Sequence, residues 1–217
     1  MKKYSKAGLL IVTLVIPALI FTFLRFFATN HYNVPYYFPL KDENGNVVIN
    51  KNDTAFYAIK ALNVKKSDGS SLSPNPFVGK LTVVHYQPGI CDDTCQIVFS
   101  NLERIYNLRE KNPSLNLLTI CDTISDVNKI KPALSDKDGW LISKVATKDL
   151  NNVFDTTLKF QTKVPGAKTN SIKSKLMLVD EEAHIRGYYN GYDPEEINRL
   201  MAEIKILNFE KGASSQN

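Results

Sequence analysis

Two cysteines, Cys91 and Cys95, lie four residues apart in this chain. They follow the apolar run 81–86 and open the periodic stretch 97–108, which predicts a dithiol at the start of a helix after a buried strand. Four-residue spacing brings both sulfurs onto one helix face, one turn apart. The pair can therefore close a disulfide or bind one soft metal ion, and it indicates redox chemistry, copper chemistry or both.

A purely structural Cys91–Cys95 disulfide is the alternative to a functional pair. Closing so short a loop constrains the unfolded chain little, since the stabilisation by a disulfide grows with loop length. A redox or metal-binding role for the two cysteines is therefore the more economical interpretation.

The third cysteine, Cys121, ends a predicted strand over residues 115–121. It is either a buried core residue or a sulfur within reach of the pair, where it would resolve a mixed disulfide or serve as a third soft ligand. His85, six residues before Cys91, is a second possible third ligand, although a histidine on a strand is more often packed in the core.

Hydrophobic patterning after residue 80 alternates between strands and helices. The strands are predicted at 81–86, 115–121 and 140–145, the helices at 93–109, after the capping residue Asp126 and at 150–160, and a hairpin at 175–179 and 184–189. This order predicts an α/β fold with a layered sheet and helices on its faces.

The last helix has the clearest start signal in the chain. Asp193 is a natural N-cap, Pro194 suits the first turn and Glu196 completes a capping box. One apolar stripe at helical spacing follows and predicts core packing: Ile197, Leu200, Met201 and Ile204.

The N-terminus has the pattern of a membrane anchor. No charge appears from residue 7 until Arg25, while three lysines precede this run. We expect a cytoplasmic N-terminus at 1–6, an uncleaved single-pass transmembrane helix at 7–27, and all that follows on the periplasmic side of the cell (inner) membrane. A cleaved secretory signal is the alternative and implies the same compartment. An aromatic connector at 28–40, one domain at 41–208 and a loose tail at 209–217 complete the predicted organisation.

Composition and the absence of certain motifs argue against several kinds of function. The 217 residues are 43% hydrophobic, enough for one well-packed domain. The net charge of +5 comes from scattered lysines, with no basic stripe carrying aromatics, so we expect no nucleic-acid binding. The chain also has no Gly-rich phosphate loop, G-x-S-x-G or H-E-x-x-H pattern.

The ordered set of motifs resembles the Sco/SenC family over residues 36–207. After the anchor come PGICDDTC (88–95), TICD (119–122), LMLVD (176–180) and IRGYY (185–189). The resemblance implies a membrane-anchored thioredoxin-like fold, with a central mixed β-sheet flanked by helices, and a role in cytochrome c oxidase assembly.

Family members bind copper through the two cysteines and a distal histidine just before the strand that matches 176–179. The matching position here is Ile172, beside Lys173, and neither replaces imidazole, because isoleucine has no lone pair and lysine is normally protonated. Copper bound by Cys91 and Cys95 would therefore be Cu(I), which tolerates two sulfur ligands, with Cys121 or His85 as a possible third.

Three functions remain open. The chain delivers copper, or it is a thiol-disulfide oxidoreductase that keeps a partner's cysteines reduced, or it is a non-catalytic docking protein with a structural disulfide. The expected partner is a cytochrome c oxidase subunit or another protein with a thiol or copper site. In the first two functions Cys91 is the nucleophile or first ligand and Cys95 the resolving cysteine. The absence of the family's distal histidine favours the thiol-disulfide oxidoreductase over copper delivery.

Overall fold

The computed structural model describes residues 3–27, 33–51, 53–62, 64–66, 69, 72, 75–87, 93–122, 137–160 and 174–214. The chain divides into two units, Met1–Asn33 and Val34–Asn217. The first contains helix α1 (Lys3–Phe27), with Pro17 inside it. Within the residues described, no helix combines the length and apolar character needed to cross a lipid bilayer. The membrane anchor therefore stays a prediction from the sequence.

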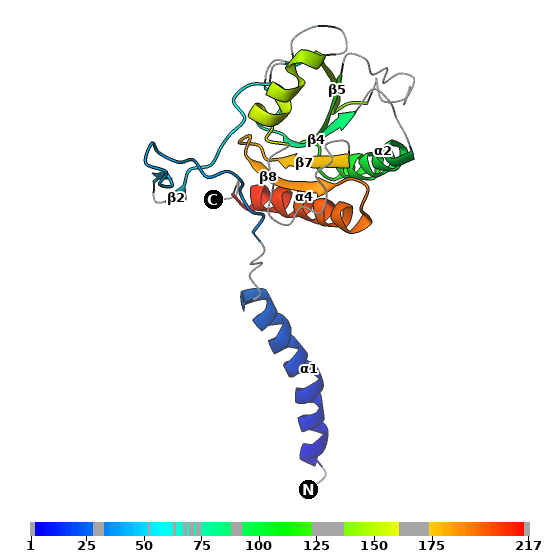
Figure 1. The fold of residues 1–217 in the computed structure, drawn as a ribbon. Helices are drawn as coiled ribbons and strands as arrows, with labels where there is room; N and C mark the ends of the chain where they lie inside the picture. The colour runs from blue at the N-terminus through cyan, green and yellow to red at the C-terminus, as the bar shows by residue number, and fades with distance from the viewer. Residues whose placement is uncertain are drawn as a thin grey trace. The chain divides into compact units, whose positions relative to one another are not determined.

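The second unit is built on a six-stranded mixed sheet in the order β3-β6-β5-β4-β7-β8 (Figure 1). Strands β4, β5 and β6 run parallel to one another. Strand β3 is antiparallel to β6, and β7 is antiparallel to both of its neighbours, β4 and β8. The predicted α/β architecture is confirmed. The strands are β3 (Lys65–Lys66), β4 (Leu81–Gln87), β5 (Leu115–Asp122), β6 (Trp140–Val145), β7 (Lys175–Val179) and β8 (Ile185–Asn190).

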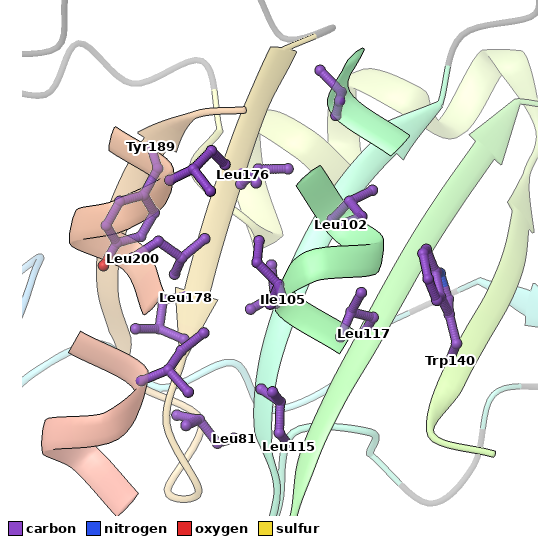
Figure 2. Close-up of a cluster of buried hydrophobic side chains, with 14 of the residues drawn as sticks. Leu81, Leu102, Ile105, Leu115, Leu117, Trp140, Leu176, Leu178, Tyr189 and Leu200 are labelled. Atoms are coloured by element: carbon purple, nitrogen blue, oxygen red, sulfur yellow. The ribbon is translucent and has the colours of Figure 1, made fainter. Parts of the chain in front are cut away.

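Helices cover both faces of this sheet. Helices α2 (Asp93–Tyr106) and α4 (Pro194–Ser214) pack on one face, as Figure 2 shows, and the π-helical segment η4 (Asn152–Thr157) packs on the other. Three shorter elements complete the described chain: a two-stranded ribbon of β1 (Ile49–Asn50) and β2 (Asp53–Thr54), and the 3-10 turns η1 (Asn107–Glu110) and η3 (Thr147–Asp149).

The predicted helices are partly wrong in type or length. The helix expected over 93–109 is α-helical only to Tyr106 and then tightens into η1. The segment 150–160 is mainly a π-helix, because the adjacent residues Val153 and Phe154 are both buried and the wider turn admits both into the core. Helix α4 continues to Ser214, through residues expected in a loose tail. The helix expected after Asp126 lies outside the described residues.

The start of α4 confirms half of the predicted capping box. The Asp193 carboxylate accepts a hydrogen bond from the Glu195 amide at 3.0 Å, as an N-cap does. The Glu196 side chain instead pairs with Arg199 at 2.7 Å, and the Asp193 amide donates to the Asn190 carbonyl. The four residues of the predicted stripe pack into the core, Met201 being only partly buried.

Side-chain alternation on β4 decides which residues face α2. Leu81 and Val83 belong to the core cluster under α2 and α4, while Val84 and Tyr86 belong to the cluster on the opposite face. Since successive side chains on a strand point to opposite faces, the odd-numbered positions at the end of β4 point towards α2. They are His85 and Gln87.

Candidate functional site

Cys95 lies in the first turn of α2, where the sequence predicts the dithiol. Its side chain is buried, with 7% of the residue exposed, and it is disulfide-bonded. Cys91 lies outside the described residues, so its pairing with Cys95 stays a prediction. A sulfur in the first turn of a helix lies at the positive end of the helix dipole, which favours negative charge on it during thiol exchange.

Gln87 contacts this sulfur from the sheet. It is the last residue of β4 and is completely buried, and its Oε1 lies 3.3 Å from the Cys95 Sγ. Gln87 was not among the predicted site residues. The signal that identifies it is its position: Gln87 directly follows the run 81–86 predicted as a buried strand and lies two residues after His85, so both side chains point to the same face.

Cys121 lies beside Gln87 in the sheet. The two residues are register partners on the parallel strands β4 and β5, so their side chains point to the same face. Cys121 is a completely buried cysteine that forms no disulfide, and it belongs to the same core cluster as Cys95. The predicted core position of Cys121 is confirmed, and its role as a third sulfur within reach of the pair stays a prediction.

His85 lies one step further along β4 on the same face. Only 2% of the residue is exposed. Its ring packs edge-on against the ring of Phe99 on α2, with 5.5 Å between the ring centroids. Burial lowers the pKa of His85 to about 3, so the imidazole is neutral near pH 7. Its Nδ1 has no hydrogen-bond partner among the described residues. The packed role is confirmed, and a ligand role stays a prediction.

These positions together form a candidate site around Cys95 at the carboxyl end of β4 and β5. The disulfide-bonded Cys95 at a helix start contacts the buried Gln87 amide, and Cys121 and the neutral His85 imidazole lie beside that amide on the same face of the sheet. Such a site can exchange disulfides, and after reduction its sulfur and nitrogen atoms can bind a soft metal ion. The positions that match the family's distal ligand, Ile172 and Lys173, lie outside the described residues.

A second polar cluster lies in the turn of the β7–β8 hairpin. Asp180, Glu182 and His184 have potential metal-ligand atoms within 4.8 Å of one another. The Asp180 carboxylate, however, pairs with Arg186 at 3.0 Å and accepts hydrogen bonds from the backbone amides of Glu182 and His184. The guanidinium neutralises the carboxylate that a divalent cation would need, so we assign this cluster a structural role.

Arg186 also attaches the segment before the domain core to this hairpin. Its guanidinium donates hydrogen bonds to the carbonyl oxygens of Val34 and Pro35 and lies 3.7 Å from the ring centroid of Tyr36. A cavity of about 240 Å³ opens beside it, lined by Tyr36 and Arg186 and also by Leu81. Because Leu81 begins β4 and Gln87 ends it, the cavity lies at the far end of this strand from the dithiol.

Comparison with known proteins identifies the fold through structure rather than sequence. No family model matches the chain, and no curated protein matches it in sequence. Among solved structures, this chain is similar to BsSco, described as a member of the Sco family of cytochrome c oxidase assembly proteins. The two have 14% identity and a TM-score of 0.55, and the match covers 70% of this chain and 93% of BsSco. A SCO1/SenC family lipoprotein from Bacillus anthracis has 14% identity and a TM-score of 0.53, covering 68% and 94%. This chain therefore has the thioredoxin-like fold of Sco/SenC proteins.

Proposed function

We propose that this chain is a Sco-type thiol-disulfide protein that keeps cysteines of a copper-site partner reduced during cytochrome c oxidase assembly. The observation that carries the proposal is the disulfide-bonded Cys95 in the first turn of α2, at the carboxyl end of the central strand. Further support comes from BsSco, which shares this fold and for which a disulfide switch is described.

The proposed exchange needs two thiols with different tasks. In the reduced protein, Cys91 attacks a disulfide of the partner, and one partner sulfur leaves as a thiolate and takes up a proton. Cys95 then attacks the mixed disulfide and releases the second partner sulfur. The partner gains two electrons, and this chain is left with the Cys91–Cys95 disulfide.

Copper delivery is the second candidate function, with Cu(I) as cargo. It is supported by the donor set on the α2 face, where Cys121 and His85 flank the residue that contacts Cys95. The buried imidazole is neutral, so its nitrogen lone pair is available without the loss of a proton. The disulfide must first be reduced, because the thiolate and not the disulfide binds the metal. Two sulfurs and one nitrogen suit Cu(I) better than Cu(II).

One experiment separates these functions. The purified full-length protein is equilibrated with glutathione redox buffers and, separately, titrated anaerobically with Cu(I) against a competing chelator. Wild type is compared with Cys91→Ser and Cys121→Ser. We expect reversible cycling of the dithiol that Cys91→Ser abolishes and Cys121→Ser leaves intact.

The Cu(I) titration decides whether this chain delivers copper. Tight one-to-one Cu(I) binding that is lost in Cys91→Ser would establish a carrier, and its loss in Cys121→Ser would identify the third ligand. A disulfide that resists mild thiols, with no competitive copper binding, would contradict both functions and favour a docking protein with a structural disulfide.

We also propose that the N-terminal segment anchors the domain on the periplasmic side of the inner membrane. The charge-free run of residues 7–24 supports this, as do the exposed large apolar side chains on α1, such as Leu14 and Phe21. In cells, the full-length protein is expected to stay in the membrane fraction after alkaline carbonate washing, and a variant beginning at residue 28 is expected to be released. Release of the full-length protein by carbonate would contradict the anchor.

A further inference from the structure

Gln87, which is completely buried, contacts the disulfide-bonded sulfur of Cys95 through its side-chain oxygen. In the disulfide, the Cys95 Sγ carries no hydrogen, so the 3.3 Å approach of Oε1 is a close contact and not a hydrogen bond. After reduction the same sulfur carries a proton. The amide oxygen then lies where a thiol S–H can donate to it.

We propose that Gln87 is a positioning residue for the dithiol: its side-chain oxygen holds Cys95 as a protonated thiol in the reduced protein and so favours reduction of the disulfide. The inference rests on the proposed thiol-disulfide function. It assigns the nucleophilic role to Cys91, because a sulfur whose proton is held by an acceptor is the poorer nucleophile.

The contact of Gln87 with Cys95 differs between the two redox states. A hydrogen bond between two buried groups stabilises the state in which it forms, and it forms only in the reduced protein. In the oxidised protein the same oxygen faces a sulfur with no proton to donate. Packing excludes water from this contact, since Cys95 is buried above Gln87 and His85 packs against Phe99 beside it.

Reduction of the disulfide by dithiothreitol tests this role of Gln87. Dithiothreitol supplies two electrons and two protons: the protein S–S bond breaks, each protein sulfur gains a proton, and the reagent closes its own cyclic disulfide. A change at Gln87 that acts only on the reduced state must therefore shift this equilibrium and not merely its rate.

We expect Gln87→Met to lower the equilibrium constant for reduction by about three- to tenfold, which is the worth of one buried hydrogen bond. Methionine has a similar length and no oxygen acceptor, so packing changes little. Purified full-length protein is equilibrated with reduced and oxidised dithiothreitol, quenched with acid, and alkylated in denaturant. Mass spectrometry then gives the reduced fraction.

Two further variants make the test specific. Gln87→Glu keeps an oxygen at the same reach and is expected to be reduced at least as readily as wild type. Ser143→Ala removes a buried polar atom from β6 that has no partner among the described residues, and it is expected to leave the equilibrium unchanged. Ser143 alternates with Trp140 and Ile142 and so points to the face opposite the dithiol.

Failure of the inference differs from failure of the proposed function. If wild type cycles with dithiothreitol and Gln87→Met has the wild-type equilibrium, Gln87 has no positioning role while the function stands. If Gln87→Met does not fold, a Gln87→Glu protein that is harder to reduce than wild type overturns the inference. If wild type itself does not cycle, the proposed function fails first.

Discussion

Replacing Arg186 by methionine is expected to lower the free energy of unfolding by about 3–5 kcal/mol. Both side chains of the Arg186–Asp180 pair are only 6% exposed, and their charged atoms are 3.0 Å apart. Removing the guanidinium leaves the Asp180 carboxylate buried without its cation, which costs more than the pair itself contributes. The variant also loses the hydrogen bonds to the carbonyl oxygens of Val34 and Pro35. Urea unfolding at pH 7 measures the effect.

The matched control is an ion pair that joins α4 to the same hairpin turn. Lys211 pairs with Glu181 at 2.7 Å, but half of the lysine side chain is exposed. Lys211→Met is therefore expected to cost about 0–1 kcal/mol, the usual range for a surface pair. In a double variant, Asp180→Leu should recover part of the stability lost with Arg186→Met, because no unpaired charge then remains. Equal losses in Arg186→Met and Lys211→Met would contradict the structural role.

Lowering the pH from 7 to 5 is expected to cost about 2 kcal/mol of folding stability through His85 alone. Burial lowers its folded-state pKa to about 3 from an ordinary value of 6.5. Between these values the unfolded chain binds a proton that the folded protein does not, so the free energy of unfolding falls as the pH falls. The contribution is absent above about pH 6.5, where the imidazole is neutral in both states.

Other groups also titrate in this range, so the diagnostic quantity is the difference between wild type and His85→Leu. Leucine fits an apolar site against Phe99, and it removes an Nδ1 that has no partner among the described residues. Chemical unfolding at pH 7 and pH 5 should show a stability loss that is about 2 kcal/mol smaller in His85→Leu. The same loss in both proteins would mean that His85 is protonated in the fold as readily as in the unfolded chain.

Much of the fold could be predicted because its signals are local. The strands at 81–87, 115–122 and 140–145 contain apolar runs that the sequence shows directly, and their predicted positions were right within one residue at each end. The N-cap Asp193 was also right, because a side chain that caps a helix acts within its own turn. The π-helix at Asn152–Thr157 was missed, since its wider turn depends on how Val153 and Phe154 pack against the sheet.

The candidate site was likewise only partly predictable from the sequence. The sequence identified Cys95 at a helix start, and it named Cys121 and His85 as neighbours without deciding between core and site. The structure shows that Cys121 and His85 are both buried, and the register of β4 and β5 places Cys121 beside Gln87. Gln87 itself was overlooked, since no motif contains it and only its contact with Cys95 shows its importance.

By itself, the sequence determined the positions of the central strands, the helix start that carries Cys95, and the chemistry that two thiols can perform. These depend on residue type and on spacing within one element. Only the tertiary structure decided that Gln87, Cys121 and His85 lie on the α2 face of the sheet and that Arg186 neutralises Asp180. Such contacts depend on strand order, register and burial, and these are set by packing between segments far apart in the chain.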